Sequence, residues 1–291
     1  MTNVATELAT TSQATGAVGK KKANWTFRFA VGWLVVVVLV VLLGELLPFV
    51  TDPNEKNRDL ISGGPTWSNW FGNATFGQDV FSRVVRGGRI SLFIALMVTA
   101  IGIIIGGFMG LLAGYLRGWV DSLMRLIISV TLSIPALLLV IFIVTIRDQS
   151  LLTVILAVSL LAIPALARIV RASTLQVADR DFVKAAEVLG VKKSSILLRE
   201  VLPNVMPTMI SFAFLTTGIV LVVESSLSFL GLSVEAPTIT WGSIIAEGRI
   251  KFTDTPHMVF LPGLVLFLTV LSLNFVGDQL LKRYDVREAS L

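Results

Sequence analysis

A polar interruption in an otherwise apolar chain reads Phe182-Val-Lys-Ala-Ala-Glu-Val-Leu-Gly-Val-Lys-Lys-Ser-Ser-Ile-Leu-Leu-Arg-Glu-Val-Leu-Pro-Asn204. Apolar stretches flank it on both sides, and each is long enough to cross a bilayer, which takes about 20 residues of helix. Such alternation is typical of a membrane protein whose spans are joined by a folded polar loop. The sequence therefore predicts an all-α polytopic fold, with this loop as its most distinctive feature.

The composition supports a membrane protein and excludes several kinds of site. Hydrophobic residues make up 54% of the 291 residues, and charged residues only 15%. The absence of cysteine excludes disulfides and thiolate metal sites, and a single histidine argues against most imidazole sites. We therefore expect no metal site and no catalytic residue. The net charge of +5 fits basic residues retained on one side of a membrane, and no basic patch interleaved with aromatics suggests nucleic acid.

Six membrane spans are predicted from the apolar stretches. Their expected bounds are Phe27–Phe49, Ile90–Ala113, Leu123–Ile146, Leu151–Val170, Val205–Val223 and Met258–Leu281. An even number of spans places both termini on the same side. With these termini in the cytoplasm, sixteen Lys and Arg residues are cytoplasmic and eight are external, as the positive-inside rule favours. The stretch Thr51–Arg89 argues against this orientation, because it carries five of the eight.

The predicted organisation follows from these spans. Residues 1–24 are expected to form a disordered cytoplasmic tail, and residues 25–89 the first span with an external segment. Residues 90–287 are expected to form a core of five helices, whose cytoplasmic loop covers 180–204. Residues 288–291 would be the cytoplasmic C-terminus. The expected location is a bacterial cytoplasmic (inner) membrane, crossed several times.

Glycines recur at every fourth position of the second predicted span. This places them on one helical face, where another helix can approach closely. The face predicts either tight packing within the protein or with a partner subunit, or a mobile gating contact. The four residues are Gly102, Gly106, Gly110 and Gly114.

The polar loop is predicted to form a helix, a turn and a second short helix. The first helix has an apolar stripe with small residues at its middle, made by Phe182, Ala185, Ala186 and Leu189. Asp181 would cap its start, and Gly190 would end it in a left-handed conformation. Small side chains allow a helix to seat closely in a groove of another protein. An amphipathic helix lying on the membrane surface would show the same periodicity.

The second helix of the loop would be capped by Ser194 or Ser195 and run through Arg199. Pro203 would then occupy the first turn of the next span.

Three acidic residues fall within or at the edge of predicted spans, where an ionised side chain is costly. We expect Asp278 to pair with Lys282 one turn later. Glu224, followed by Ser225 and Ser226, either borders a translocation path or outer gate, or lies among lipid headgroups. Glu45 has no obvious partner in the sequence.

The chain resembles a known family at several places in order. The polar loop resembles the pattern Glu-Ala-Ala, three residues, Gly, then Leu-Pro, by which permeases of bacterial ATP-driven importers dock onto ATPases. Lys184, Ala185, Ala186, Gly190, Leu202 and Pro203 occupy its positions. Matches continue through Phe76–Arg83, Gly87–Leu92, Leu112–Tyr115, Gly118–Asp121, Leu132–Ala136, Leu227–Leu232, Trp241–Gly242, Ala246–Arg249 and Asn274–Asp278. The family is that of dipeptide, oligopeptide and nickel importers, and the shorter of its two permeases is the better match.

The resemblance implies a type I ABC importer permease fold and a docking role for the polar loop. The residues concerned are Phe182, Lys184, Ala185, Ala186, Glu187, Leu189, Gly190, Leu202 and Pro203. Lys184 stands where the motif commonly has Glu, so the ion pairs of this contact would differ. The implied partners are a second permease in a heterodimer, two ABC ATPase subunits and an extracytoplasmic solute-binding protein. This chain would bind no cofactor, while ATP and Mg²⁺ would be used by the ATPases.

Two other functions are conceivable for a chain of this composition. A self-sufficient secondary carrier should show inverted repeats and charged residues in broken helices at mid-membrane, and no convincing repeat is found. An intramembrane hydrolase would have to use a carboxylate or a Ser-Lys arrangement. The phosphate-binding motif Gly-x-x-x-x-Gly-Lys-Ser/Thr does not occur in the sequence, so ATP hydrolysis is expected in another chain.

Overall fold

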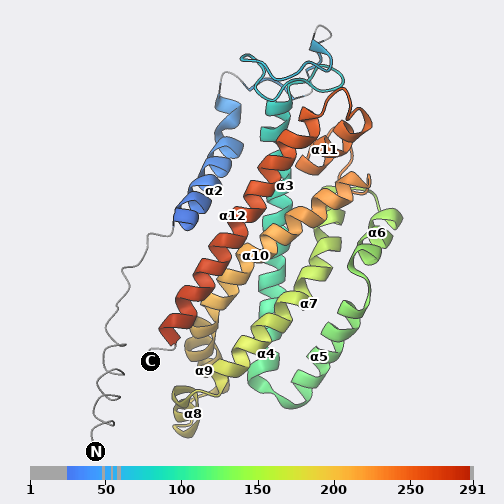
Figure 1. Ribbon diagram of the computed structural model, residues 1–291. Coiled ribbons are helices and arrows are strands. Elements are labelled where there is room, and N and C mark those ends of the chain that lie inside the picture. The colour runs from blue at the N-terminus through green and yellow to red at the C-terminus, as the bar shows by residue number, and fades with distance from the viewer. Residues whose placement is uncertain (1–24, 48–49, 54, 58–59, 289–291) are drawn as a thin grey trace, which may run out of the picture.

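The computed structural model describes residues 25–288 apart from 48–49, 54 and 58–59, and this part is a bundle of long helices (Figure 1). The predictions for the tail 1–24 and for residues 289–291 lie outside the described residues, and so does the side chain of Glu45. The helices are α2 (Trp25–Leu43), α3 (Val80–Ile101), α4 (Gly107–Leu116), α5 (Gly118–Ser133), α6 (Ala136–Ile146), α7 (Leu151–Ala178), α8 (Asp181–Val188), α9 (Lys193–Ile196), α10 (Leu202–Phe229), α11 (Trp241–Ile250) and α12 (His257–Glu288).

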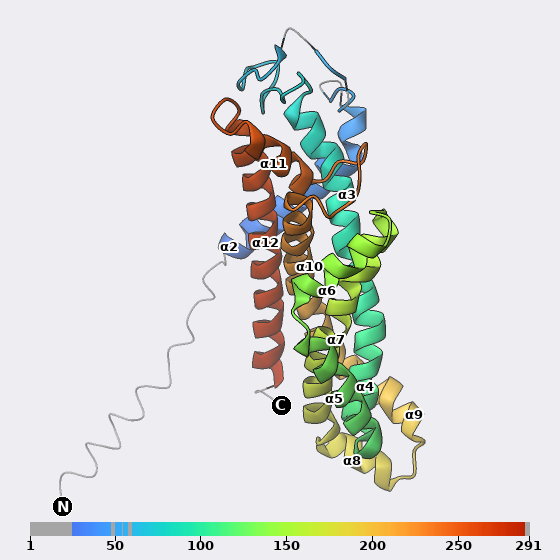
Figure 2. The ribbon, with the colours of Figure 1, turned by 90° about the vertical axis from the view of Figure 1, so that its right-hand side faces the viewer.

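Within the described residues, five helical stretches are long and apolar enough to cross a membrane, and the pair α5–α6 makes a sixth if counted as one span. The all-α prediction is confirmed. Figures 1 and 2 show α8 and α9 at one end of the bundle and α11 at the other. We refer to these as the α8 end and the α11 end.

The second span begins ten residues earlier than predicted, at Val80 instead of Ile90. The Asp79 carboxylate caps this helix by accepting from the Ser82 backbone N–H at 2.7 Å. A π-helical turn, Gly102–Gly106, then joins α3 to α4 within one continuous helix. Arg83 and Arg89, predicted in an external segment, therefore lie within the first half of α3, where Arg83 pairs with Glu247 and Arg89 donates to backbone carbonyls of α2.

The third predicted span is broken in two. α5 and α6 meet at an angle of 79° across Ile134 and Pro135. Proline lacks a backbone N–H and disfavours the helical region for the residue before it, and Ile134 is accordingly extended at φ −81° and ψ 128°. Pro164, by contrast, stays inside the continuous helix α7.

The four-residue glycine repeat lies against α7. A side chain on Gly110 would meet the Ala167 carbonyl oxygen at 2.6 Å, and one on Gly114 would meet Thr174 Cβ at 2.6 Å. Gly102 and Gly106 face Ala162 and Ile163 in the same way. The repeat thus packs against another helix of the same chain, because atoms of α7 occupy the space that larger side chains would need.

Buried side chains form two separate clusters. The larger one reaches from mid-bundle to the α11 end and includes Trp241, which is fully buried. The smaller one lies at the α8 end and joins Val170 of α7, Val183 of α8, Ile196 of α9 and Val205 of α10. The polar loop is therefore attached to the bundle through a hydrophobic core of its own.

Candidate functional site

The helix α8 ends in a Schellman motif. Val191 N–H donates to the Ala186 carbonyl at 3.1 Å, and Gly190 N–H donates to the Glu187 carbonyl at 3.0 Å. Gly190 has φ +73°, so the left-handed termination predicted from the sequence is present. The turn is thus defined by its own hydrogen bonds.

The start of α8 differs from the prediction. Arg180 occupies the N-cap position and makes no side-chain cap, while Asp181 is the first helical residue. The Arg180 carbonyl accepts from the Val183 and Lys184 N–H groups, which moves the helix start one residue earlier. Asp181 thus stands in the first turn, where a negative charge is favoured by the helix dipole.

The predicted apolar stripe of α8 is divided between two faces. Val183 is only 1% exposed, and Ala186 packs beside it against the small core cluster. Phe182 and Ala185 lie on the exposed side, as does Leu189 just after the helix. Ala186 is therefore not part of the outer face, because burial of the larger Val183 turns this side of the helix inward.

The tip of the loop exposes large apolar side chains. Val188 is 88% exposed and Leu189 is 82% exposed, on a segment that also carries Lys184 and Glu187. Exposed apolar residues next to charged ones mark a surface that another protein can cover. This tip is the candidate functional site of the chain.

The second helix of the loop continues directly into the next span. α9 follows Lys192, and neither Ser194 nor Ser195 caps it. A π-helical turn, Leu197–Val201, carries it into α10, because helical hydrogen bonding is not interrupted there. The predicted separate helix ending at Arg199 is therefore wrong. Leu202 packs partly against the small core cluster, and Pro203 is exposed in the first turn of α10.

Two polar contacts tie the loop to the corner between α4 and α5. The Tyr115 hydroxyl donates to Glu187 Oε1 at 3.3 Å, and Arg117 Nη2 lies 2.6 Å from Asp179 Oδ1. Arg117, through this hydrogen bond, holds the pKa of Asp179 below its usual value, and the charge of Lys184 acts in the same direction. Asp179 is therefore ionised at neutral pH.

A second ion-pair cluster lies one turn further along α5. Both Asp121 oxygens accept from Arg171 of α7, with the Nη2 to Oδ2 distance at 2.9 Å. Arg125 Nε lies 3.3 Å from the same carboxylate. Arg171 thus holds α5 against α7.

At the other end, Glu224 is fully buried. Its carboxylate accepts from the Ser228 hydroxyl at 2.8 Å, from the Ser233 hydroxyl at 3.1 Å and from the Ser91 hydroxyl at 3.3 Å. Ser91 in turn accepts from the Trp241 backbone N–H at 3.1 Å. The headgroup alternative for Glu224 is wrong, since its carboxylate is buried and bonded to α3 and to α10 with the segment after it, while Ser91 links it on to the start of α11.

The two serines after Glu224 have different environments. The Ser226 hydroxyl bonds to the carbonyl of Val222 in its own helix at 2.8 Å. The Ser225 hydroxyl oxygen is buried and has no hydrogen-bond partner among the described residues. These serines therefore do not share the hydrogen bonds that satisfy Glu224.

Asp278 is exposed, and in the described part of the chain no ion pair joins it to Lys282. The predicted pair is wrong, because two solvated charges gain little from being held together.

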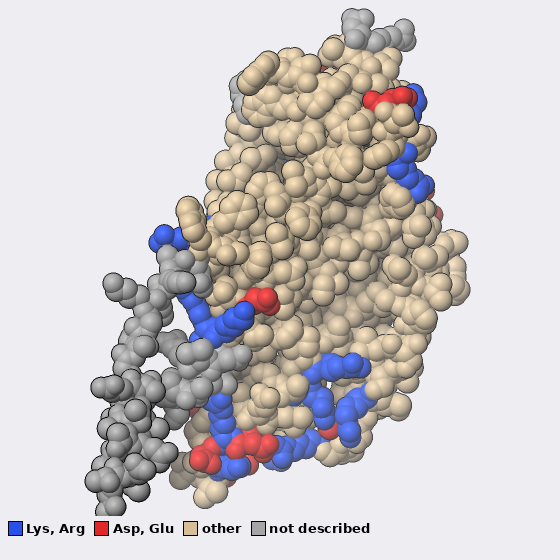
Figure 3. Space-filling model, in the orientation of Figure 1, with Lys and Arg blue, Asp and Glu red and all other residues tan. Residues whose placement is uncertain are grey.

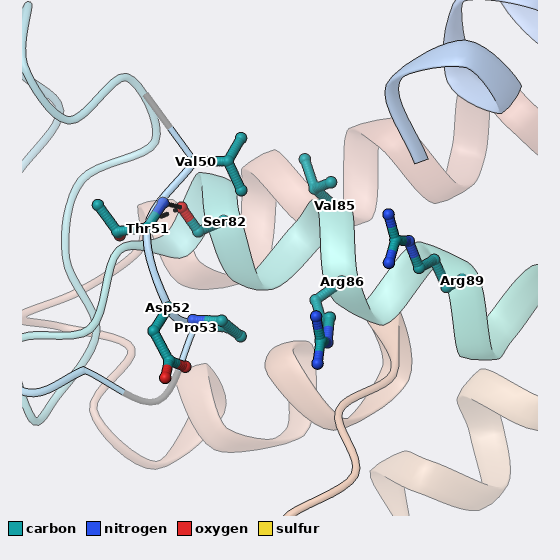
Figure 4. Close-up of a pocket in the computed structure, with 8 residues that line it drawn as sticks. All are labelled: Val50, Thr51, Asp52, Pro53, Ser82, Val85, Arg86 and Arg89. Carbon is teal, nitrogen blue, oxygen red and sulfur yellow. Dashed lines mark hydrogen bonds between the residues drawn. The ribbon is translucent and has the colours of Figure 1, made fainter. Parts of the chain in front are cut away.

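A cleft of about 250 Å³ opens between α3 and the segment that follows α2 (Figure 4). Ser82, Val85, Arg86 and Arg89 line it from α3, and residues 50–53 line it from the other side. Arg89 Nε donates to the Val41 carbonyl at 2.7 Å, which attaches α3 to α2. Among the described residues, no group of three His, Asp or Glu side chains is arranged to hold a metal ion.

Spanning helices and a structured polar loop with an exposed apolar tip are the features expected of a membrane permease subunit. The model of one family, described as "Binding-protein-dependent transport system inner membrane component", matches residues 102–289. The chain belongs to this family. It is therefore a non-catalytic permease subunit of an ATP-driven importer, and it crosses the bacterial inner membrane several times.

Curated relatives support the same assignment. The chain is 34% identical over 252 residues to a glutathione transport system permease protein, GsiD, of Pectobacterium atrosepticum, covering 87% of this chain and 83% of the relative. It is 36% identical to GsiD of Escherichia coli O6:K15:H31, with the same coverage. The expected resemblance to the dipeptide and oligopeptide family is confirmed.

Solved structures support the fold. An inward-facing structure of the MetNI methionine ABC transporter matches with a TM-score of 0.56 at 19% identity, covering 70% of this chain and 97% of that chain. A second crystal form of the same transporter gives a TM-score of 0.54, also at 19% identity, over 69% of this chain and 96% of that chain. The type I importer permease fold is therefore confirmed.

The contacts around the loop are not predicted by the sequence patterns. Tyr115 lies in a family motif, but nothing in that motif points to Glu187. Arg117 before Gly118, at the junction of two apolar stretches, is a usable signal of a corner, because Gly often marks a sharp turn. The pairing of Arg117 with Asp179, 62 residues away, has no local signal.

Proposed function

We propose that the loop α8–α9 is the docking site for the ATPase subunits of the importer. The observation that carries this proposal is the contrast within α8: Val183 anchors it in a core, while Val188 and Leu189 are 88% and 82% exposed. A helix that only lay on the membrane would direct its apolar side chains toward lipid. Here the apolar tip adjoins a hydrogen-bonded Schellman turn at the far end of the bundle, which suits insertion into a groove of another protein.

The docking surface consists of the exposed side chains of the loop. Phe182, Ala185 and Leu189 supply apolar contact, and Lys184 and Glu187 supply charge. Ala186, Gly190, Leu202 and Pro203 support the surface by shaping the loop and its junction with α10. Because Lys184 replaces the Glu common at its position, we expect an acidic residue of the ATPase opposite it.

The α8 end is proposed to face the cytoplasm, together with both termini. Figure 3 shows charged side chains of this face gathered mostly toward the end that carries α8, below a broad uncharged surface. The excess of sixteen Lys and Arg residues over eight supports this orientation. It would place ATP, Mg²⁺ and two ATPase subunits on the side where α8 is accessible.

The opposite end would then receive the solute. A second permease is proposed to complete the path as a heterodimer, and an extracytoplasmic solute-binding protein would deliver the solute near α11. We propose Glu224, Ser225 and Ser226 as part of a closed outer gate, since Glu224 bonds to Ser91 of α3 and Ser228 of α10, and Ser91 accepts from the Trp241 backbone N–H of α11. We propose peptides or a related small solute as the substrate class, and the names of the relatives favour glutathione.

Purification of the tagged chain from its own cells tests the proposal. We expect two ATPase chains, a second permease and a binding protein to copurify, and mass spectrometry of ligand released from the binding protein to find a short peptide. Fusion of a reporter to the C-terminus should give a cytoplasmic signal. A complex without any ATPase would overturn the docking role.

A further inference from the structure

The corner between α4 and α5 has an unusual backbone. Arg117 has φ +53° and ψ −159°, and Gly118 follows with φ +58°. This region is readily adopted by Gly but is strained for any residue with a side chain. A strained residue persists only where surrounding contacts hold it in place.

The Arg117 guanidinium reaches the segment just before α8. Its Nη2 lies 2.6 Å from Asp179 Oδ1, and Asp179 is two residues ahead of the first residue of α8. Both side chains are largely exposed, at 51% and 62%. An exposed ion pair of this kind contributes little on balance and can break and re-form easily. Buried Tyr115 and the Asp121–Arg171 pair hold the corner on either side, and the Arg117–Asp179 pair adds a contact that is easily released.

A second contact runs in parallel from the last turn of α4. The Tyr115 hydroxyl donates to Glu187 in the middle of the docking loop at 3.3 Å, and Tyr115 belongs to the small core cluster. Tyr115 thus reaches Glu187 in α8, and Arg117, two residues later, reaches Asp179 just before α8. Movement of α8 would act directly on the Tyr115–Glu187 contact, and it would reach the Arg117–Asp179 pair through the short connection between α7 and α8.

The other side of the corner is α5. Asp121, one turn after Arg117, is held to α7 by Arg171, and the helix then runs to the 79° break at Pro135. α5 is thus held to α7 near its start. At its far end it does not continue straight into α6, so its direction can change without bending a continuous helix. A change of backbone conformation at Arg117 would tilt α5 about the Asp121 contact.

We infer that the Arg117–Gly118 corner is the joint by which movement of the docking loop is passed to α5, and that the Arg117–Asp179 pair is its releasable tie. This inference rests on the proposed docking of ATPases to α8. In the tied state the strained corner is retained, and in the released state it relaxes and α5 changes its tilt. Arg117 acts here as a positioning residue.

The test uses the complete importer reconstituted in proteoliposomes, with ATP hydrolysis and solute uptake measured together. In Asp179→Asn the tie is weakened while shape is kept. We expect copurification of the ATPases and ATP hydrolysis to persist, and uptake per ATP to fall at least about fivefold. Arg168→Gln, an exposed arginine of α7 outside the joint, serves as the matched control and should keep normal coupling.

A charge reversal distinguishes coupling from a general structural defect. Arg117→Asp combined with Asp179→Arg restores the opposite charges, and Asp tolerates positive φ better than most residues. We expect the double variant to recover much of the lost coupling. Arg117→Gly, which relieves the strain and removes the tie, should remain uncoupled although it folds normally.

Two failures are distinguishable. If no ATPase copurifies with the wild-type chain, the docking proposal and the joint both fail. If the ATPases copurify normally and Asp179→Asn transports with wild-type uptake per ATP, the joint is overturned and the docking role stands.

Discussion

The two ends of the molecule hold their short helices in different ways. At the α11 end, Trp241 is fully buried, its indole N–H donates to the Val84 carbonyl at 2.8 Å, and its backbone N–H is bound by Ser91. At the α8 end, Val183 and Ala186 pack α8 against the small core cluster, Tyr115 donates to Glu187, and the Arg117–Asp179 ion pair just before α8 is exposed. The hydrogen bonds of the α11 end are shielded from water. At the α8 end, water competes for the charged groups of the ion pair.

This difference has a mechanical meaning. Buried polar networks are costly to break, because each group left unpaired loses its hydrogen bonds without regaining water. Exposed contacts exchange with water at little cost. Moving α11 away from the bundle should therefore cost more than moving α8, and opening the proposed outer gate would have to break the buried hydrogen bonds of Glu224.

The largest expected effect is loss of the buried carboxylate. In Glu224→Ala, three serine hydroxyls lose their common acceptor, so we expect the free energy of unfolding to fall by about 3 kcal/mol or more. Thermal unfolding of the detergent-solubilised protein measures this. Glu235→Ala, an exposed glutamate nearby, should have little effect. If the two variants were equally stable, the contacts of the α11 end would not be costlier to break than those of the α8 end.

A glycine at the α11 end should tolerate no side chain. A Cβ on Gly242 would lie 2.6 Å from Ser225 Cα and 2.7 Å from Ser228 Cβ. Gly242→Ala should therefore cost about 1–3 kcal/mol through overpacking. Gly263→Ala, at a helical position with nothing within 4 Å, is the control and should be neutral or slightly stabilising. A neutral Gly242→Ala would mean that α11 can move away from α10.

The matching change at the α8 end should act through the backbone. Gly190 has φ +73°, and no atom lies within 4 Å of the place an alanine methyl would take, so Gly190→Ala should cost about 1 kcal/mol from conformation alone. We expect faster proteolysis of the loop with little change in global unfolding, and lower uptake per ATP. Gly190→Asn should retain more of the turn, since Asn adopts the left-handed region more readily. Similar losses for Ala and Asn would point to a cause other than backbone conformation.

The smallest effect on stability is expected at the apolar tip. Val188→Ser with Leu189→Ser removes side chains that the chain itself hardly covers, so the free energy of unfolding should change by no more than about 0.5 kcal/mol. Copurification of the ATPases should nevertheless fall sharply. Ile250→Ser, at an equally exposed position of the α11 end, should leave it intact. If the ATPases copurified fully with the double serine variant, the docking surface would have to lie elsewhere on the chain.

Much of the fold is predictable from the sequence because it rests on local patterns. Apolar length predicts the spans, and Gly190 predicts the end of α8, since a left-handed turn needs a particular residue at a particular place. The early start of α3 is not predictable in this way, because a charged residue such as Arg83 is expected outside a membrane-spanning helix. It is buried in the structure through its pair with Glu247, 164 residues away.

The errors in the candidate site have a related cause. Serine before a short helix suggests a cap at Ser194 or Ser195, but α9 continues into α10 and its ends are fixed by tertiary packing. Asp121, Arg171 and the partners of Glu224 come from segments distant in sequence. Contacts between distant segments produce no repeating pattern in the sequence from which they could be predicted.

The burial of Glu224 also bears on how the protein enters the membrane. During synthesis, Ser91 is made long before α10, whereas Ser228 and Ser233 emerge after Glu224. The carboxyl group therefore arrives with one hydrogen-bond donor already available from an earlier helix and the others still to come. Insertion of α10 should accordingly depend on α3 being held close by, and the hydrogen bonds of Glu224 can be completed only after Ser233 has emerged.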